Sequence, residues 1–518
     1  MVGARAISLL RRLFLKICVI VFCFSSMALA SAVNAADKYV VKNNPGAVFP
    51  YESWTTAAGD IQTAVDAALE GEPVMVRSSA RWPFLAQRSY RSPGETVWVR
   101  AGVYDSGGKP DGSWRSKLTN RVAISKAIIV RSENNDPVNT IIKGAWSSDG
   151  RTNGPGAVRC VSMADGSALI GFTLTGGATL TTNEEYASSA DRSGGGVWAR
   201  SSLASISNCI ITGNSAFGDP RGTTRGGGGV CGGKYFNCVL KDNTTPLHGG
   251  GADHAVLFNT MIAGNSAGGN GGGIKSCELQ GGVVSNNSAV GQGGGAYGGS
   301  LDDCELVGNR SGHHGGGAAV SDGDGWIVLS GCVVAGNHSD RVGGGVRFAC
   351  LFNCLISSNT AASGGQGAYQ SSASNTLFHG NDFLRGFDCH NSLFVQSAAE
   401  GMGNMHNCSF VGSRGSGFAA YPGKTCELFR CVSWSNSRPD SGAIIAYNSC
   451  GAGGPYTNAA LGNTTNNPMF VDYAAGDYRL RDDSPCRGAG FNPGKIIFSR
   501  SGSAQRLEEI KSENRNEQ

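Results

Sequence analysis

The chain has 518 residues, of which 79 are glycine, about twice the usual share, and 40% of the residues are hydrophobic. The absence of a Gly-X-Y period excludes collagen, and the hydrophobic share is too high for a disordered glycine-rich linker. With 43 basic and 39 acidic residues the formal charge is only +4, which argues against nucleic acid as a partner.

Residues 1–35 have the pattern of a secretory signal peptide. A basic start precedes the apolar run ICVIVFCFSSMALA and small residues at a cleavage site after Ala35. A retained membrane anchor is the alternative, but the apolar run is short for a membrane span. Cleavage would leave as many basic as acidic residues. We therefore expect an exported protein, either extracellular, cell-surface or periplasmic, with no transmembrane segment after cleavage.

A repeat of mostly 22 residues then runs through the chain. Glycine triplets, each followed by a small or branched apolar residue, start at Gly194, Gly227, Gly249, Gly271, Gly293, Gly315 and Gly343, with a degraded copy at Gly365. In phase with them runs a row of asparagines: Asn214, Asn243, Asn265, Asn287, Asn309, Asn337, Asn359 and Asn381. Three positions before each asparagine stands a large apolar residue. Chance does not keep three such rows in register over eight copies.

Stacked coils of parallel strand fit this repeat best. The segments between the glycines are short and β-prone, as in CVVAGN and CIITGN. In such a stack each residue lies above its counterpart one coil away, at about 4.8 Å. Asparagine suits such a structural ladder because it tolerates the left-handed conformation at a turn and can hydrogen-bond its neighbour's amide. Glycine at the start of a strand permits a positive φ and leaves room for the next coil.

The pairing of GGG[VAI] with [FILV]xxN resembles the GGA[ILV] and FxxN repeat of the polymorphic outer-membrane proteins. More broadly, the chain resembles right-handed parallel β-helix proteins of the pectin-lyase-like class. GDIQTAVDAALEGE followed by ETVWVRAGVY is similar to their opening, in which an amphipathic helix caps the first coil. The segment NNPMFVDYAAGDYRLRDDSPCRGAG is similar to their closing segment. The resemblance implies fold and export, whereas this fold hosts lyases, hydrolases, adhesins and inert stalks alike.

The expected architecture is therefore all-β: a single-stranded right-handed parallel β-helix, a solenoid of about 13 coils of about 22 residues, with an N-terminal capping helix. The expected divisions are the signal peptide at 1–35, an N-terminal cap at 36–96, the β-helix at 97–490 and a polar, disordered tail at 491–518. The cap contains an arginine-rich insert at 72–95 that is either a lid or a solvated loop. The tail is polar and cannot form the membrane barrel that ends the adhesins of the resembling family.

Alternation along the strand after each triplet sorts the side chains. An inward row is apolar: Val230, Ala252, Ile274, Ala296, Ala318, Val346 and Ala368. The next position should then point out, giving Trp198, Cys231, Asp253, Lys275, Tyr297, Ala319, Arg347 and Tyr369. His248, Asn270, Gln292 and His314 precede the triplets and flank the same glycine ridge. The predicted ligand-binding residues are Trp198, His248, Asp253, Lys275, Tyr297, His314, Arg347 and Tyr369. The alternative is an ordinary solvated strand face.

The resemblance also implies how catalysis would work, if there is any. Lyases of this fold use a basic side chain on that strand to take a proton, often beside Ca²⁺ held by carboxylates. The catalytic candidates are then Lys275, Arg347 and Asp253. Asp253–His254 and His313–His314 are candidate acid–base pairs, with plain surface residues as the alternative.

Neither a metal nor another cofactor is expected, because the central outward row contains no acidic cluster. Ca²⁺ bound by the loop Ser321–Trp326 stays an open alternative to a simple turn. Fifteen cysteines follow the signal peptide, and an odd number leaves at least one thiol without a partner in the chain. Several of these cysteines stand five positions before a ladder asparagine, and we interpret them as a buried thiol ladder: Cys209, Cys238, Cys304, Cys332 and Cys354.

The sequence leaves two functions open. The first is a secreted, monomeric, non-catalytic β-helix whose long surface binds or scaffolds, with a polysaccharide or cell-surface glycan as partner. The second is a polysaccharide lyase or glycoside hydrolase acting along the glycine-rich strand. The missing carboxylate constellation favours the first. The aromatic and charged outward row favours the second.

Overall fold

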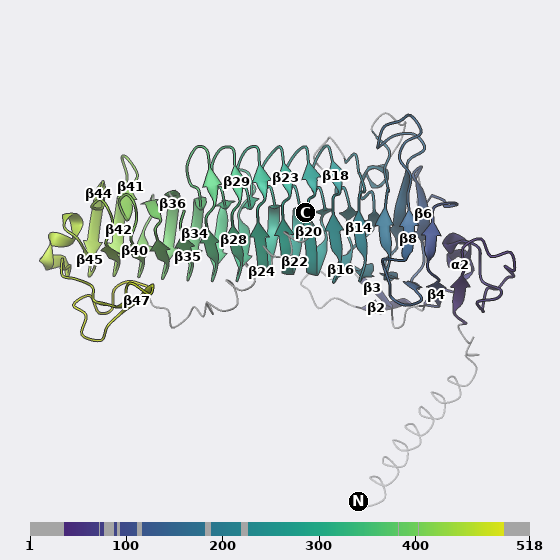
Figure 1. Cartoon of the computed structure of the whole chain (residues 1–518), viewed down its shortest axis with the longest axis horizontal. Coiled ribbons are helices and arrows are strands. Elements are labelled where there is room, and N and C mark those ends of the chain that lie inside the picture. The colour runs from purple at the N-terminus through teal and green to yellow at the C-terminus, as the bar shows by residue number, and fades with distance from the viewer. Residues whose placement is uncertain are drawn as a thin grey trace, which may run out of the picture.

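The chain winds into an elongated stack of coils whose strands pair in parallel with strands of the coils before and after them (Figure 1). The computed structural model describes residues 36–71, 73–76, 87–90, 94–110, 116–181, 188–218, 226–381, 383–401 and 403–491. The predicted signal peptide, most of the arginine-rich insert and nearly all of the predicted tail lie outside the described residues. The architecture is the expected all-β solenoid, a single-stranded parallel β-helix.

Four parallel ladders run along the stack. The long ladder contains β1 (Lys38–Val40), β4 (Thr96–Val99), β7 (Ile129–Ser132), β10 (Ala168–Ile170), β13 (Ser205–Ser207), β16 (Lys234–Phe236), β20 (Val256–Ala263), β22 (Ile274–Ser285), β24 (Ala296–Val307), β27 (Ile327–Ser330), β31 (Ala349–Phe352), β34 (Ala368–Ser374), β36 (Phe383–His390), β39 (Met405–His406), β42 (Thr425–Phe429) and β44 (Ala443–Tyr447). The pre-asparagine ladder contains β5 (Gly102–Tyr104), β8 (Thr140–Lys143), β11 (Thr173–Thr175), β14 (Ile210–Thr212), β17 (Val239–Lys241), the later parts of β20, β22 and β24, β28 (Val333–Ala335), β32 (Leu355–Ser357), β35 (Leu377–His379), β37 (Leu393–Val395), β40 (Ser409–Val411), β43 (Val432–Trp434) and β45 (Cys450–Gly451).

The other two ladders follow the asparagines and the glycines. The post-asparagine ladder contains the two-residue strands β18 (Thr244–Thr245), β21 (Ser266–Ala267), β23 (Ser288–Ala289), β25 (Arg310–Ser311), β29 (His338–Ser339) and β33 (Thr360–Ala361). The post-glycine ladder contains β6 (Thr119–Ile124), β9 (Val158–Met163), β12 (Val197–Ala199), β15 (Val230–Cys231), β19 (Ala252–Asp253), the first parts of β22 and β24, β26 (Ala318–Ala319), β30 (Val346–Arg347), the first parts of β34 and β36, β38 (Ala398–Gly401) and β41 (Phe418–Ala420).

The ladder asparagines stack along one buried corner, as predicted. The side-chain oxygen of Asn287 accepts from the backbone N–H of Asn265 at 2.9 Å and from its amide at 3.0 Å. The amide of Asn287 in turn donates to the carbonyl of Ile262 at 2.9 Å and to the side-chain oxygen of Asn309 at 3.0 Å. The same pattern recurs from Asn214 to Asn381, so that each amide joins two neighbouring coils.

The expectation that these asparagines adopt the left-handed conformation is wrong. Positive φ belongs instead to the residue directly before each of them: Gly213, Asp242, Gly264, Asn286, Gly308, Gly336, Ser358 and Gly380. That residue makes the turn, and the asparagine after it is free to direct its amide inward. Gly, Asn and Asp supply most of these corner positions because they tolerate positive φ best.

Each glycine of a triplet is required for a different steric reason, as Gly249–Gly251 illustrates. Gly249 has φ of +70°, a conformation that residues with a Cβ rarely adopt. A Cβ on Gly250 would lie 2.2 Å from the carbonyl oxygen of Gly272 in the next coil. A Cβ on Gly251 would lie 3.0 Å from the amide nitrogen of Asn265, within the asparagine ladder. The triplets are therefore points of close approach between coils.

The stack begins earlier than the predicted boundary at residue 97 and contains more than 13 coils. The strand β1 already pairs with β4, and the long ladder has sixteen strands among the described residues. The difference in number arises partly because the coils after Asn381 shorten: Asn375 and Asn391, which are stacked corner residues, are only 16 positions apart. The stack ends near β45, which bridges to Thr464. The antiparallel hairpin β46 (Phe470–Asp472) and β47 (Asp477–Leu480) then folds back along it (Figure 1).

The predicted thiol ladder is present. Cys209, Cys238, Cys304, Cys332 and Cys354 are buried free thiols. Their row continues through small hydroxyl and thiol side chains at Thr260, Thr376, Ser392, Cys408, Cys431 and Ser449, which are also buried. Burial raises the pKa of the Cys238 thiol to about 11, so this thiol stays protonated. One disulfide, between Cys450 and Cys486, ties the chain after the hairpin to the last coil.

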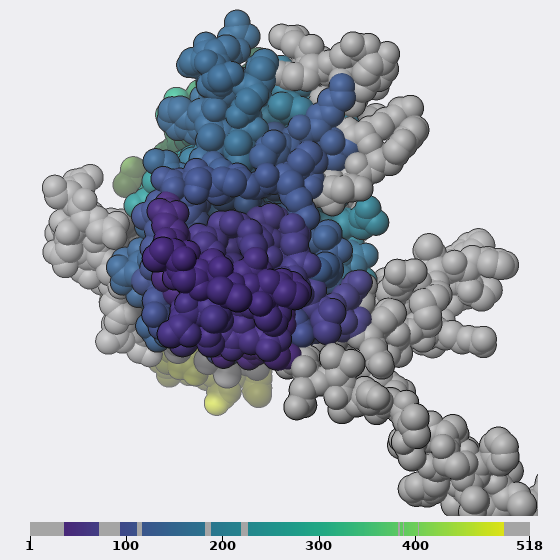
Figure 2. All heavy atoms as spheres, turned by 90° about the vertical axis from the view of Figure 1, so that its right-hand side faces the viewer, coloured from purple at the N-terminus to yellow at the C-terminus, as the bar shows by residue number. Residues whose placement is uncertain are grey.

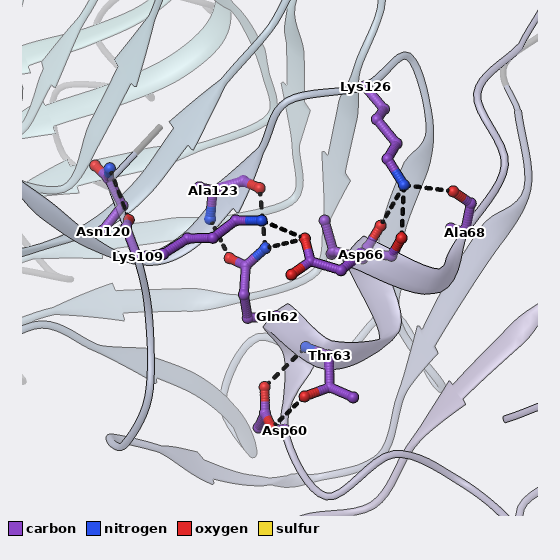
Figure 3. Close-up of polar contacts among 10 residues, drawn as sticks. Asp60, Gln62, Thr63, Asp66, Ala68, Lys109, Asn120, Ala123 and Lys126 are labelled. Atoms are coloured by element: carbon purple, nitrogen blue, oxygen red, sulfur yellow. Dashed lines mark hydrogen bonds and ion pairs between the residues drawn. The ribbon is translucent and has the colours of Figure 1, made fainter. Parts of the chain in front are cut away.

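A short helix closes the N-terminal end of the stack. Figure 2 shows the purple N-terminal part of the chain covering this end. The helix α2 (Ile61–Ala67) begins at Asp60, whose carboxylate accepts the Thr63 N–H at 2.9 Å. At its other end, the ammonium of Lys126 donates to the carbonyls of Asp66 and Ala68, each at 2.7 Å (Figure 3). The capping helix that the sequence predicted is therefore built into the first coils.

One side chain of this helix covers the outer edge of β6, the first strand of the post-glycine ladder. The amide of Gln62 accepts from the N–H of Ala123 at 2.6 Å and donates to its carbonyl at 3.3 Å (Figure 3). Gln62 thus provides the two hydrogen bonds that a preceding strand would make to β6. Unpaired strand edges invite association with other chains, and covering them is a common way to prevent it.

Replacing Gln62 by alanine should destabilise the N-terminal end of the stack. It removes both bonds to Ala123 and leaves a buried N–H unpaired, which costs about 1–3 kcal/mol. Denaturant unfolding would measure this. Lys109→Ala is the matched control, because it removes a neighbouring exposed ion pair to Asp66 worth less than about 1 kcal/mol. Equal effects of the two changes would contradict the edge-covering role.

Asn287→Ala should destabilise the protein more than a change at the adjacent exposed corner. It breaks the bonds to both neighbouring coils and leaves the buried N–H of Asn265 without its acceptor. We expect the free energy of unfolding to fall by at least about 1–3 kcal/mol. The control is Asn286→Gly, because Gly264 and Gly308 occupy the same corner in the adjacent coils. An unchanged melting temperature of Asn287→Ala would refute the stacking described above.

Candidate ligand-binding face

The predicted outward row lies in register along the post-glycine ladder. Successive partners across the ladder are Trp198, Cys231, Asp253, Lys275, Tyr297, Ala319, Arg347 and Tyr369. The row then continues through Arg385 and Glu400, which pair in sequence after Tyr369. Successive strands of this ladder therefore place all these residues in one line along the stack.

The expectation that this whole row is open to solvent is wrong. Cys231, Asp253 and Ala319 are fully buried, and Tyr297 and Arg347 are 8% and 7% exposed. The covering comes partly from the row before the triplets and partly from an inserted loop. The N–H of Gly226, before the preceding triplet, donates to Asp253 at 2.6 Å. Trp198, Lys275 and Tyr369 are the members that stay half-exposed.

The inserted loop Ser321–Trp326 covers the centre of the row. The hydroxyl of Tyr297 lies 2.6 Å from the Ser321 hydroxyl and 2.6 Å from the Asp324 carboxylate. Arg347 forms an ion pair with Asp322 at 2.5 Å and donates to the side-chain oxygen of Gln292 at 2.9 Å. Burial and the Asp324 carboxylate raise the pKa of Tyr297. The two carboxylates of the loop therefore contact the row: Asp324 contacts Tyr297 and Asp322 contacts Arg347.

Of the two candidate acid–base pairs, one forms a direct contact. A carboxylate oxygen of the buried Asp253 contacts the ring nitrogen Nδ1 of His254, whose side chain is 42% exposed. His254 lines a cavity of about 280 Å³ together with Glu278 and Ser276. His313 and His314 are farther apart, with ring centroids separated by 6.3 Å.

The remaining predicted site residues, His248, His314 and Trp198, each contact other parts of the stack. His248 accepts the N–H of Asn270 at 2.9 Å through Nδ1, and burial lowers the pKa of its ring. His314 bridges to Val342 in the next coil. The indole of Trp198 lies under the guanidinium of Arg159, 5.9 Å from the ring centroid.

The open portion of the face contains the Lys275 ammonium and a charged aromatic cluster. No side chain of the described residues pairs with this ammonium, whereas the Lys275 carbonyl accepts the N–H of His254 at 3.0 Å. Farther along, Arg385 forms an ion pair with Glu400 at 2.5 Å, and its guanidinium lies 5.3 Å from the ring centroid of Tyr421. Tyr369 precedes Arg385 in the row.

The residues Arg385, Glu400 and Tyr421 were not predicted from the sequence. Their coils lack a glycine triplet and differ in length from 22 residues, with register steps of 16 and then 23 residues on the long ladder, so the 22-residue period does not reach them. One signal was available: Phe378, Phe394 and Phe410 recur every 16 residues, and they stack in the core with centroids 4.8 and 4.7 Å apart.

Comparison with known proteins supports the fold. Residues 297–464 match the family model of the right handed beta helix region. The chain is a right-handed parallel β-helix. No curated protein matches the sequence. The family match covers the general fold and does not test the resemblance to polymorphic outer-membrane proteins.

Several solved structures show a distant overall likeness. The pectate lyase Pel9A is 12% identical, with a TM-score of 0.33, over 90% of this chain and 94% of that chain. The A-module of the mannuronan C-5 epimerase AlgE4 of Azotobacter vinelandii is 13% identical, with a TM-score of 0.32, over 68% and 88%. The Dettilon tailspike protein is 11% identical, with a TM-score of 0.31, over 68% and 62%.

The described part of the chain contains neither a metal cluster nor a membrane-spanning helix. Within the described ranges, no three His, Cys, Asp or Glu side chains gather as a metal site would require. Those same ranges contain no helix with the length and apolar character needed to span a membrane.

Stability should fall as the pH is lowered, because of His314. Burial, with Arg347 and then Arg341, lowers its pKa from 6.5 to about 4. The unfolded chain therefore binds this proton more readily, so the contribution of His314 to stability is complete above about pH 6.5 and is lost towards about pH 4. Denaturant unfolding across this range should show a smaller loss for His314→Gln, which has Gln292 as a precedent in the same row.

The matched control for this pH series is His379→Gln, which changes an exposed histidine on another ladder. Its pH profile should follow that of the unaltered protein. If His314→Gln also follows it, His314 contributes nothing to the acid sensitivity.

Proposed function

We propose that this protein is exported and binds a linear polysaccharide or cell-surface glycan along the post-glycine ladder, as a monomeric, non-catalytic scaffold. The observation that supports this proposal is the register of the open side chains on this ladder. Tyr369, Arg385 and Glu400 lie on successive coils, and Lys275 lies on the same ladder four coils before Tyr369. A linear glycan advances about 5 Å per sugar, close to the coil spacing of about 4.8 Å. Successive sugars would therefore meet successive coils.

The open side chains have the chemistry that sugar recognition uses. Aromatic rings such as Tyr369 and Tyr421 stack on the apolar faces of sugars, and guanidinium or ammonium groups pair with acidic ones. Arg385 is already oriented by Glu400, so little side-chain freedom would be lost on binding. Glycan binding by this face is what the adhesin resemblance also suggests.

The same contacts weigh against catalysis at the predicted residues. Arg347 is held by Asp322 and Gln292 and is nearly buried, so it is poorly placed to take a proton from a substrate. Asp253 is enclosed between Gly226 and His254. A general base must reach the substrate to act. Of the three candidates, Lys275 alone is accessible.

A polysaccharide lyase or glycoside hydrolase is the second candidate function, and one observation favours it. Asp253 and His254 form a contact beside a cavity that Glu278 also lines, and a carboxylate that orients an exposed histidine is a frequent acid–base arrangement. Here His254 would transfer the proton, and Asp253 would hold its ring.

A glycan panel should reveal binding that depends on the open part of the face. Tyr369→Ala and Lys275→Ala should each weaken the affinity by about 1 kcal/mol or more, roughly fivefold to tenfold, if the ring stacks and the ammonium pairs. Calorimetry with the best glycan of the panel would measure this. The control is Phe352→Ala, since Phe352 is an exposed ring on the long ladder instead.

The same samples separate binding from turnover. Chain length of the glycan after prolonged incubation should stay unchanged for a scaffold. Cleavage that His254→Ala or Lys275→Ala abolishes would establish the enzyme instead. If a glycan binds and Lys275, Tyr369 and Arg385 can all be replaced by alanine without loss, this face is not the binding site.

A further inference from the structure

A second cleft lies at the other end of the molecule, between the C-terminal hairpin and the last coils. In Figure 1 the hairpin with β47 runs beneath these coils. This open cleft has a volume of about 900 Å³, within the range of ligand sites in proteins. Three corner residues of the stack line one side, namely Asn391, Asn407 and Arg430, and Arg479, Arg481 and Arg487 line the other.

The walls of this cleft are fixed to the stack. The disulfide between Cys450 and Cys486 joins the second wall to β45. The N–H of Gly490 donates to the carbonyl of Arg430 at 2.6 Å, and the N–H of Phe491 donates to the Ser409 hydroxyl at 2.9 Å. The cleft therefore exists before any ligand arrives, which lowers the entropic cost of binding.

The charge inside the cleft is only partly neutralised. Arg479 pairs with Asp477 at 2.5 Å and Arg481 pairs with Asp483 at 3.1 Å. Arg430, by contrast, has no carboxylate within ion-pair distance among the described residues. The guanidinium of Arg487 donates to the carbonyl of Asp482 at 3.4 Å and pairs with no carboxylate of the described residues. Asp482 is the one acidic residue of the described chain that lines the cleft.

A structural role does not account for these arginines. If their task were to hold the hairpin against the coils, they would form ion pairs across the cleft. Arg479 and Arg481 instead pair with carboxylates two residues away in their own segment. Arg430 projects from the facing coil with no acidic partner among the described residues, so the cleft gathers like charges from two sides, a repulsion that a bound anion would relieve.

We propose that this cleft binds an anionic ligand that carries two or more carboxylate, sulfate or phosphate groups. Guanidinium groups bind such oxyanions through paired, charge-assisted hydrogen bonds, and the side-chain amides of Asn391 and Asn407 add neutral donors. The site lies at the corner between the long and pre-asparagine ladders, not on the post-glycine ladder. It is therefore independent of the glycan face proposed above.

Calorimetry on the purified full mature chain at low salt tests the proposal. The probes are inorganic sulfate, tripolyphosphate and oligogalacturonate. We expect tripolyphosphate or oligogalacturonate to bind more tightly than sulfate, and Arg430→Asn and Arg487→Gln to weaken that binding about tenfold each. Arg430→Asn suits the fold, because Asn391, Asn407 and Asn448 occupy the same corner with similar positive φ.

Further variants distinguish a loss of binding at this cleft from a loss caused by misfolding. Asp482→Asn removes the acidic lining residue and should tighten binding, a gain that a damaged fold would not produce. Arg414→Gln changes an exposed arginine outside the cleft and should leave the affinity unchanged. Lys275→Ala should also have no effect, which separates this site from the glycan face.

The outcomes are distinct. Preference for tripolyphosphate identifies a phosphorylated ligand, whereas preference for oligogalacturonate identifies an acidic polysaccharide, and either supports the proposal. Binding that Arg414→Gln weakens as much as Arg430→Asn would overturn it, because only the overall charge would then matter. Failure of all three probes to bind at low salt would overturn it as well.

Discussion

The corner where glycine meets asparagine is the constraint on which the rest of the structure depends. There the backbones of neighbouring coils approach so closely that a Cβ on Gly250 would lie 2.2 Å from the carbonyl oxygen of Gly272, while a Cβ on Gly251 would crowd the side-chain amide of Asn265. That amide joins Asn287 and the carbonyl of Leu240, so it fixes coils on both sides of its own. Hydrogen bonds of this kind keep every coil in the same register, because a shift of one residue would leave buried amides without hydrogen-bond partners. The straight rows of side chains on the other faces follow from that register.

A stack of this kind is stable along its length and vulnerable at its ends, where a coil has no neighbour. The two ends of the stack are closed in different ways. At the first end a side-chain amide, Gln62, replaces the missing strand, and Lys126 satisfies the last carbonyls of the helix that carries it. At the second end the chain turns back on itself and is fastened by the disulfide to Cys486. The first solution covers an edge and the second creates a cleft.

The sequence predicted what is periodic. The rows of glycines, asparagines and cysteines follow from spacing alone, since stacking places each residue on its counterpart. The burial of Arg347 could not be predicted in this way, because Asp322, which holds it, belongs to an inserted loop outside the rows. Gly226, which binds Asp253, does lie in the row before the triplets, but spacing alone does not show that its N–H donates to this carboxylate. Arg385 and Glu400 were missed because their coils have a different length. The disulfide joins the stack to a segment beyond the repeat, which no spacing indicates.

The departures from the repeat are therefore the places where this protein acquires chemistry of its own. Coils of 22 residues present nearly the same bare ridge again and again. Asn309 and Asn337 are 28 positions apart, and the six additional residues between them include the loop that engages Tyr297 and Arg347. The short coils that follow Asn381 bring Arg385 beside Glu400, with Tyr421 against the guanidinium. The repeat sets the distance between side chains along the face, and the irregular coils decide which of them are open, paired or covered. Specificity on such a solenoid depends on coil length as much as on residue type.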